Sequence, residues 1–362
     1  MSSACERPVL IMAGGTGGHV FPGLAVAEAL RQRGIPVVWL GSRAGLEARL
    51  VPPRGIPMEW VEVTGMRGKG LLRLVLAPLM LSRALWQSLA VLRRLHPRLA
   101  IGLGGFVSGP GGLMAALYGI PLLVHEQNAI AGWTNRLLAR FACVVFEAFP
   151  GSFPQRLKPV VVGNPVRADI CALPAPAERR DSRREGWRLL VLGGSQGALA
   201  LNQFVPRALA LMPRELRPQV RHQAGEHLLA VAREAYREAN IEATICPFID
   251  DMAEAYAWAD LVVCRAGALT ISELAAAGVA SILVPFPHAV DDHQTANGRF
   301  LADAGAALLV PQAELSEQCL AALLQELAAD AGRRAAMADA ARALARTDAA
   351  ERVAEEALRH AR

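Results

Sequence analysis

The chain has 362 residues, of which 53% are hydrophobic and 20% are charged, and its formal net charge is +5. This composition excludes wholesale disorder, and the length suits two domains better than one hydrophobic core. The six cysteines form no C-x-x-C pair and have no histidine at zinc spacing, so we expect reduced thiols in a cytoplasmic protein, without disulfides or a metal site. Residues 1–18 lack the basic start and long apolar core of a signal peptide.

Apolar runs typical of β-strands alternate with helical patterns along the whole chain, which predicts an α/β fold with parallel sheets. In the first half we expect strands at 9–13, 37–40, 99–101, 122–125 and 144–146. In the second half we expect them at 189–192, 220–223, 243–246, 261–264 and 282–284. The proline-rich, charged stretch 172–185 predicts an exposed linker or surface loop, and the sequence after residue 330 predicts helix.

The segments LIMAGGTGG at 10–18 and LLVLGGSQG at 189–197 resemble each other, and a helical pattern follows each of them. This similarity predicts two Rossmann-like domains. We call residues 14–18, 104–112 and 193–197 the first, second and third glycine loops. A strand that ends in glycines and opens a helix presents backbone N–H groups to a phosphate, although any single loop of this kind can also serve only to pack a helix on a strand.

Two other nucleotide-binding classes fit the glycine loops poorly. A dinucleotide fingerprint needs G-x-G-x-x-G and an acidic residue about 20 residues later, but Val20 takes the place of the third glycine and the second strand ends without an acid at 40–43. No G-x-x-x-x-G-K-[ST] motif of a P-loop occurs either. We therefore expect neither a dinucleotide oxidoreductase nor a P-loop ATPase.

The stretch 63–98 is basic and strongly apolar, with seven Lys or Arg and no Asp or Glu. A membrane-spanning helix needs roughly 20 uninterrupted apolar residues, and Arg73, Pro78 and Arg83 interrupt this one. Two interpretations remain: a helix that lies on an anionic membrane surface, or a core helix flanked by solvated arginines.

Polar clusters follow the expected strands of both halves, where α/β folds place ligands. They are HEQN at 125–128, GNPVR at 163–167, FIDDM at 248–252, RAGALTISE at 265–273 and PFPHAVDDHQTAN at 285–297. Each cluster alone could provide helix caps or a satisfied core histidine. Their shared position favours a common ligand-binding cleft.

Seven motifs, in this order along nearly the whole chain, resemble the MurG family of bacterial glycosyltransferases, family 28. They are GGTGGH at 14–19, GGFVSGPGG at 104–112, HEQN at 125–128, GNPVR at 163–167, GGSQG at 193–197, CRAGALTISE at 264–273 and DDHQ at 291–294. One departure is Phe106, where several members carry tyrosine. The resemblance implies a GT-B fold: residues 1–166 with a final helix at about 345–362 form an acceptor and membrane-docking domain, and residues 167–344 form the donor domain.

The activity that this resemblance implies is inverting transfer of GlcNAc from UDP-GlcNAc to the 4-OH of MurNAc-pentapeptide in lipid I. The product is lipid II, which serves peptidoglycan synthesis and with it cell shape and division. The implied setting is peripheral, on the cytoplasmic face of the inner membrane, with other cell-wall synthesis proteins as further partners and without cofactor, metal or nucleic acid. The alternatives are a UDP-GlcNAc 2-epimerase-like isomerase of the same fold and a non-catalytic binding protein.

The chemistry and the resemblance together suggest roles for particular residues. His19 is the expected general base, because it follows a phosphate-type loop at a helix start. Glu126 is the alternative base, and the alternative role of His19 is to orient a phosphate group. The expected UDP-GlcNAc contacts are Thr16, Gly17, Gly18, Asn128, Arg167, Ser195, Ile249, Ala268, Leu269, Thr270, Ile271, Ser272, Glu273 and Gln294. The expected contacts of the acceptor diphosphate are Gly17, Gly18, Gly104, Gly105, Ser108 and Gly109.

The lipid-linked acceptor favours the membrane interpretation of the basic stretch 63–98. The expected docking face is made of Leu72, Arg73, Val75, Leu76, Leu79, Arg83 and Trp86.

Overall fold

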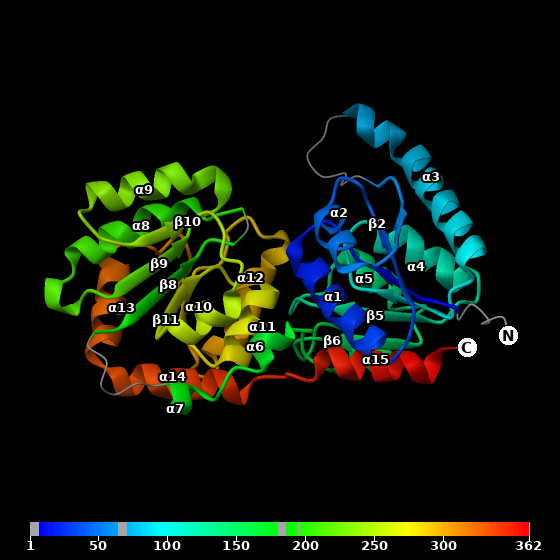
Figure 1. The fold of residues 1–362 in the computed structure, drawn as a ribbon. Helices are drawn as coiled ribbons and strands as arrows, with labels where there is room; N and C mark the ends of the chain where they lie inside the picture. Colours follow the sequence, from blue (N-terminus) through cyan, green and yellow to red (C-terminus); the bar gives the residue numbers. More distant parts are fainter. Residues whose placement is uncertain (1–6, 64–70, 180–185, 195, 362) are drawn as a thin grey trace. The chain divides into compact units, whose positions relative to one another are not determined.

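The computed structural model describes residues 7–63, 71–179, 186–194 and 196–361; for 71–76 and 290 it describes the backbone but not the surroundings of the side chains. The chain divides into two compact units, coloured along the sequence in Figure 1. Unit 1 contains residues up to Arg167 together with Thr347–Arg362, and unit 2 contains Ala168–Arg346.

In the described part of unit 1, seven parallel strands form one sheet in the order β3-β2-β1-β4-β5-β6-β7. The strands are β1 Val9–Met12, β2 Val37–Gly41, β3 Met58–Trp60, β4 Leu99–Gly102, β5 Leu122–Glu126, β6 Val144–Glu147 and β7 Val160–Val161. The helices are α1 Gly17–Gln32, α2 Glu47–Leu50, α3 Leu71–Leu95, α4 Ser108–Leu117, α5 Trp133–Leu138 and α15 Ala349–His360.

In the described part of unit 2, six parallel strands repeat this arrangement in the order β10-β9-β8-β11-β12-β13. The strands are β8 Arg188–Leu192, β9 Gln219–Gln223, β10 Thr244–Cys246, β11 Leu261–Cys264, β12 Ala280–Leu283 and β13 Ala307–Leu309. The helices are α6 Ala168–Cys171, α7 Pro176–Arg179, α8 Leu199–Leu211, α9 Leu229–Glu238, α10 Met252–Trp258, α11 Ala268–Ala277, α12 His293–Ala302, α13 Glu317–Ala329 and α14 Ala331–Ala343.

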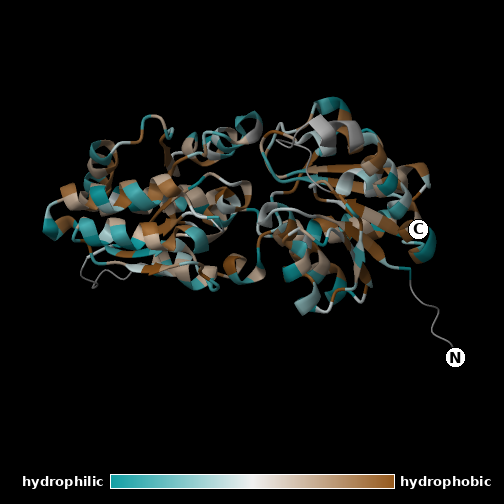
Figure 2. Cartoon of the chain, turned by 90° about the horizontal axis from the view of Figure 1, so that it is seen from above, coloured by the Kyte–Doolittle hydropathy of each residue, from teal (hydrophilic) through white to brown (hydrophobic). Residues whose placement is uncertain are grey.

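Both sheets have the Rossmann strand order, in which the chain changes direction across the sheet beside its first strand. The central strands are buried on both faces, as expected for parallel sheets covered by helices: every residue of β1, β4, β11 and β12 is buried. Figure 2 accordingly shows strongly hydrophobic strands inside each unit and hydrophilic residues on the helices around them. The expected α/β class is confirmed.

The last helix, α15, packs in unit 1 although it follows unit 2 in the chain (Figure 1). Its apolar residues Val353, Ala354 and Ala357 are buried in one cluster with Val20 and Leu24 of α1. Their spacing of one, three and four residues places them on a single face of the helix. Burial of this face therefore completes the core of unit 1.

All ten strands expected from the sequence are present within a few residues of their predicted ends. The expectation missed β3, β7 and β13, which are short strands at or near sheet edges. In the described part of 172–185, Ala172, Pro174, Ala177 and Glu178 are exposed, as expected for a surface loop. The segment also contains the short helix α7 and belongs to unit 2, where Arg179 donates hydrogen bonds to the carbonyls of Pro174, Tyr256 and Gly278. Residues 180–185 lie outside the described residues.

Candidate active site

The first glycine loop connects β1 to α1 at the carboxyl end of the sheet, and a buried carboxylate holds it in place. Glu47 is fully buried and accepts hydrogen bonds from the backbone N–H of Gly15 (2.9 Å) and from the N–H and hydroxyl of Ser42 (2.8 and 2.9 Å). A Cβ at Gly14 would lie 2.6 Å from a Glu47 oxygen, so only glycine fits there. Sequence analysis missed Glu47, because no spacing signature marks the partner of a loop.

The second glycine loop lies directly against the first. A Cβ at Gly105 would overlap the carbonyl oxygen of Gly14, and Gly105 has a φ of +81°, which favours glycine. The buried hydroxyl of Ser108 lies 2.6 Å from Met12 O and 2.7 Å from Gly104 O. The hydroxyl of Ser108 therefore links the start of α4 to the end of β1, just before the first glycine loop, and to the second loop at Gly104.

His19 stands in the first turn of α1, between the two loops and the HEQN segment. Its Nδ1 lies 2.8 Å from Oε1 of Gln127, and a Cβ at Gly104 would lie 2.8 Å from the His19 ring. The ring is partly exposed. Thr16 occupies the N-cap position of α1 without a side-chain cap hydrogen bond, so the backbone N–H groups of this turn are not capped by a hydroxyl.

Glu126 is almost completely buried at the end of β5 and acts as a second structural carboxylate. It accepts hydrogen bonds from the backbone N–H groups of Asn128 (2.9 Å) and Gly132 (3.0 Å) and from the side-chain amides of Asn128 (3.1 Å) and Asn135 (2.9 Å). Four donors saturate most of the lone pairs of a carboxylate. Glu126 therefore shapes the loop that carries Asn128.

In unit 2 the third glycine loop follows β8. The N–H of Gly193 donates to Gln223 O at 3.0 Å, and Gly197, with a φ of +77°, packs closely on the carbonyl of Ala224. Ser195, the expected phosphate contact, lies outside the described residues. The N–H of Ile249, an expected uracil contact, donates to the side-chain oxygen of Gln223 at 3.1 Å, so a nucleobase that used this N–H would replace the Gln223 oxygen.

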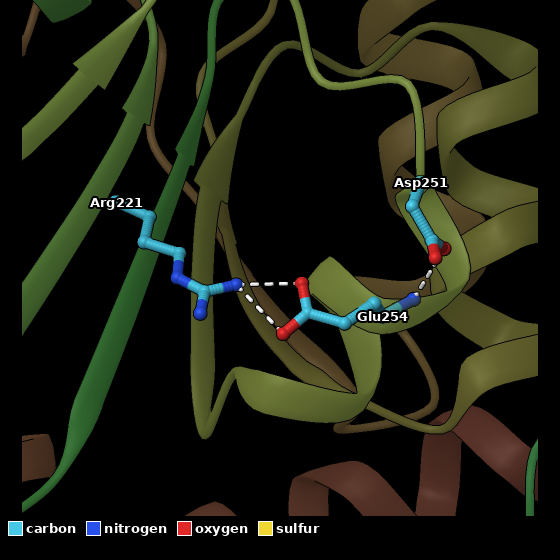
Figure 3. Close-up of polar contacts among 3 residues, drawn as sticks. All are labelled: Arg221, Asp251 and Glu254. Carbon is cyan, nitrogen blue, oxygen red and sulfur yellow. Dashed lines mark hydrogen bonds and ion pairs between the residues drawn. The ribbon is translucent and has the colours of Figure 1, made fainter.

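Polar contacts of Asp251, Glu254 and Arg221 hold the start of α10, two residues after Ile249 (Figure 3). Asp251 caps the helix by accepting from the N–H of Glu254 (2.8 Å), and Glu254 in turn pairs with Arg221 of β9 (2.6 Å). The Arg221 guanidinium also lies 4.3 Å from the ring centroid of Trp258, within cation–π range. Of the two acidic residues in FIDDM, Asp251 is therefore an ordinary helix cap.

The start of α11 presents the other expected donor contacts. Gly267 is the N-cap of this helix and makes no side-chain cap hydrogen bond, and the dipole places positive potential at this end. Glu273, one turn further, is buried and accepts from the hydroxyl of Tyr256 at 2.9 Å. Gln294 accepts from the N–H of Phe286 (2.9 Å), and Asn297 of the same helix, α12, donates to Ala266 O (3.2 Å).

The structure thus brings the expected residues together in two groups, each at the carboxyl end of one sheet. Unit 1 gathers Thr16, Gly17, Gly18, His19, Gly104, Gly105, Ser108, Gly109, Glu126 and Asn128. Unit 2 gathers Ile249, Ala268, Leu269, Thr270, Ile271, Ser272, Glu273 and Gln294. Arg167 is half-buried and is the last residue of the first segment of unit 1. Phe106, the residue that departs from the family pattern, is exposed.

Helix α3 carries the basic, apolar stretch. Its residues Ala84, Ser88 and Leu92 are buried, whereas Leu79 is 68% exposed and Trp86 is 70% exposed. Arg83 forms an ion pair with Glu62 at 2.9 Å, and Arg94 pairs with Glu59. Acidic residues from just before this stretch therefore offset part of the positive charge that was counted within 63–98. The side chains of Leu72, Arg73, Val75 and Leu76 lie outside the described residues.

No helix in the described parts of the chain has the length and apolar character needed to cross a membrane. Among the described residues there is also no cluster of three His, Cys, Asp or Glu side chains suited to a metal ion.

Comparison with known proteins places the whole chain in one family. Residues 9–147 match the glycosyltransferase family 28 N-terminal domain, and residues 188–353 match the glycosyltransferase family 28 C-terminal domain. Two similar proteins are both named UDP-N-acetylglucosamine–N-acetylmuramyl-(pentapeptide) pyrophosphoryl-undecaprenol N-acetylglucosamine transferase. The protein from Alkalilimnicola ehrlichii is 59% identical over 91% of this chain and 92% of its own length. The protein from Marinobacter nauticus is 55% identical over 100% of this chain and 99% of its own length.

Solved structures agree with this placement. The crystal structure of MurG from Acinetobacter baumannii matches with a TM-score of 0.84 and 41% identity over 98% of this chain and 99% of that one. A Listeria monocytogenes structure titled as a putative UDP-N-acetylglucosamine 2-epimerase matches with a TM-score of 0.68 at 14% identity over 96% of this chain and 95% of that one, which shows a shared fold alone. The chain has the GT-B fold and belongs to the MurG group of glycosyltransferase family 28.

Proposed function

We propose that this protein transfers N-acetylglucosamine from UDP-GlcNAc to the 4-OH of the MurNAc sugar in lipid I and so forms lipid II for peptidoglycan synthesis. The observation that carries the proposal is 55–59% identity, over 91% of the chain or more, to transferases named for this reaction. The epimerase alternative is not favoured, because its likeness to this chain is one of fold.

The donor is assigned to unit 2. The start of α11, without a side-chain cap, suits the diphosphate of UDP, since the helix dipole and backbone N–H groups stabilise the charge on the leaving group. Glu273 would accept from the ribose hydroxyls, and Ile249 would contact the uracil edge. Ala268, Leu269, Gln294 and Asn128 would surround the sugar, and Arg167 and Ser195 would add contacts to the phosphates. Thr270, Ile271 and Ser272 supply the remainder of the helix turn.

His19 is assigned as the general base. An inverting transfer needs a base that takes the proton of the acceptor hydroxyl while its oxygen attacks C1 and the C1–O bond to UDP breaks. Among the described residues Nε2 of His19 makes no hydrogen bond, whereas Glu126 is engaged by four donors. This difference in hydrogen bonding supports His19 over Glu126 as the base.

The acceptor diphosphate is assigned to the paired glycine loops of unit 1. Gly17, Gly18, Gly104, Gly105, Ser108 and Gly109 would surround it. The loops touch each other at Gly14 and Gly105, and they open the helices α1 and α4. Backbone N–H groups at two adjacent helix starts suit a dianionic ligand.

The lipid tail of the acceptor requires that the enzyme reach a membrane. We assign docking to the exposed side of α3, where Leu79, Arg83 and Trp86 share one face at spacings of four and three residues. Leu72, Arg73, Val75 and Leu76 belong to the same proposal. It implies a peripheral protein on the cytoplasmic face of the inner membrane, close to other proteins of cell-wall synthesis.

Incubation of the purified protein with labelled UDP-GlcNAc and a lipid I analogue tests the reaction. Formation of the disaccharide lipid supports the transferase, UDP-ManNAc would support the epimerase, and absence of turnover would leave only binding. For the mechanism, His19→Ala should lower kcat by about 10²- to 10⁴-fold while UDP-GlcNAc still binds. A loss below about tenfold would remove His19 as the base.

A further inference from the structure

A chain of hydrogen bonds runs from His19 into the core of unit 1, and its inner end is fixed by His125. This histidine is fully buried, and burial lowers its pKa to about 4, so its ring is neutral at physiological pH. Its Nε2 lies 2.9 Å from the carbonyl oxygen of Gly163. A carbonyl oxygen can only accept, so Nε2 carries the proton and Nδ1 holds a lone pair.

Gln127 is the middle link, and its amide can adopt only one orientation. One end lies 3.0 Å from His125 Nδ1 and 3.0 Å from the carbonyl oxygen of His125, and both of these atoms are acceptors. This end must therefore be the amide nitrogen, which donates to both. The amide oxygen of Gln127 then points at Nδ1 of His19, 2.8 Å away.

These constraints determine which nitrogen of His19 carries the proton. Because the Gln127 oxygen can only accept, His19 must donate from Nδ1, and in the neutral ring the lone pair is then on Nε2. We propose that Gln127 is a positioning residue that fixes His19 in the Nδ1–H tautomer and so makes Nε2 the basic nitrogen. The proposal rests on the assignment of His19 as the general base above.

The surroundings of Gln127 and His19 keep this arrangement rigid. Gln127 is almost completely buried, and its backbone carbonyl accepts a hydrogen bond from the side-chain amide of Asn164 at 3.0 Å. Gly104 packs against the His19 ring and leaves no room for a side chain there. The two nearby buried carboxylates, Glu47 and Glu126, are bonded to other groups of the loops.

The hydrogen-bond partner of His19 Nδ1 is thus the neutral amide of Gln127, whereas the catalytic histidine of hydrolytic triads has a carboxylate in this position. An amide oxygen holds the ring and selects the tautomer, but it stabilises the imidazolium less than a carboxylate would. When Nε2 takes the proton of the acceptor hydroxyl, the ring becomes an imidazolium with both nitrogens donating. The electron pair of that O–H bond forms the new bond to C1, and UDP leaves with the pair of the bond that breaks.

Long-range ¹H–¹⁵N NMR spectra of the full chain with ¹⁵N-labelled histidine test the tautomers directly. The chain has eight histidines, and His19→Gln and His125→Gln identify the two of interest. We expect opposite tautomers in the wild type: a protonated Nδ1 in His19 and a protonated Nε2 in His125. Detection of Nε2–H as the main form of neutral His19 in the wild type would overturn the proposal without any variant.

Gln127→Met keeps the approximate volume and removes all three hydrogen bonds of the Gln127 side chain, two to His125 and one to His19. In this variant His19 should populate the Nε2–H form, which free histidine prefers in water. We expect kcat to fall roughly 10- to 100-fold, the range seen when partners that orient functional histidines at metal sites are removed, with the donor KM nearly unchanged.

The matched control is Tyr236→Phe in unit 2, which removes the hydroxyl bonded to Nδ1 of His222. It should change the His222 resonances and leave the His19 resonances and kcat unchanged. An unchanged kcat in Gln127→Met together with wild-type His19 resonances would refute the role of Gln127. If the tautomers are as proposed but His19→Ala remains active, the general-base assignment fails and the hydrogen-bond chain stands.

Discussion

Each unit of this protein buries a histidine at the carboxyl end of its sheet, and a fixed set of hydrogen bonds holds each ring in place. In unit 2, Nε2 of His222 donates to the side-chain oxygen of Asn202 (2.9 Å), and the hydroxyl of Tyr236 donates to Nδ1 (3.0 Å). Asn202 also donates to the carbonyl of Ala224, beside the third glycine loop (3.1 Å). Burial lowers the pKa of His222 to about 3 and that of His125 to about 4.

Both histidines should make folding sensitive to mild acid. Below about pH 6.5 the unfolded chain binds a proton at each histidine, whereas the folded chain does so only near pH 3–4, so stability falls as pH falls through this window. One proton corresponds to about 1.4 kcal/mol per pH unit. We therefore expect the free energy of unfolding, measured with urea between pH 7 and 5, to fall less steeply with pH in His222→Gln than in the wild type. The difference in slope should approach that of one proton at the acidic end of this range. Equal slopes for the two proteins would contradict this expectation.

At the scale of elements, α3 is a helix whose two sides meet different environments. Ala84, Ser88 and Leu92 repeat at spacings of four and bury one side against unit 1, and Arg93 donates to the hydroxyl of Tyr118 at 2.7 Å. The opposite side leaves Leu79 and Trp86 exposed. Large apolar side chains exposed beside arginines are typical of a helix that binds a membrane surface.

Replacing both Leu79 and Trp86 with Glu should reduce binding to vesicles of anionic phospholipid, as measured by co-sedimentation, because the buried apolar area is lost and like charges are added. Activity on a soluble, short-chain acceptor should persist. The control is the double variant Leu211→Glu and Val231→Glu, which alters two exposed residues of unit 2. Wild-type vesicle binding by the Leu79 and Trp86 variant would rule out the docking face.

At the scale of the whole molecule, the chain passes between the units twice, after residues 167 and 346. Unit 2 is continuous in sequence and has a core of its own, formed around β8, β11 and β12 by helices α8 and α13. Unit 1 is discontinuous, because it needs α15. The two units therefore differ in how readily they can be isolated.

Residues 168–346 expressed alone should fold and bind UDP-GlcNAc, since the described elements of this core all lie within that range. Calorimetry should detect UDP-GlcNAc binding that is weakened several-fold, because Asn128 and Arg167, two proposed contacts, are absent from the fragment. A Glu273→Ala version of the fragment serves as the control and should bind more weakly still. A folded fragment without measurable UDP binding would overturn the assignment of the donor to unit 2.

The sequence predicted the central strands and the positions of the glycine loops, because long buried strands and glycine-rich turns carry strong local signals. It did not predict β3, β7 or β13, since short strands at the edge of a sheet depend on their neighbours more than on their own residues. Glu47 escaped notice, and Gln127 was noted only as part of HEQN without a role, for a related reason. Their importance comes from the loops that they contact, 32 and 108 residues away along the chain, and no local pattern records such a partner. The roles assigned to the site residues stay predictions.

The position of α15 has a consequence for biosynthesis. Ribosomes add about 5–20 residues per second, so on the order of 10–40 s pass between the synthesis of residue 167 and that of α15. During this time the apolar face of α1, with Val20 and Leu24, lacks the helix that covers it in the finished protein. Unit 2, residues 168–346, is synthesised during this interval. We therefore expect the nascent first unit to be the part of this chain that most needs protection from aggregation by chaperones.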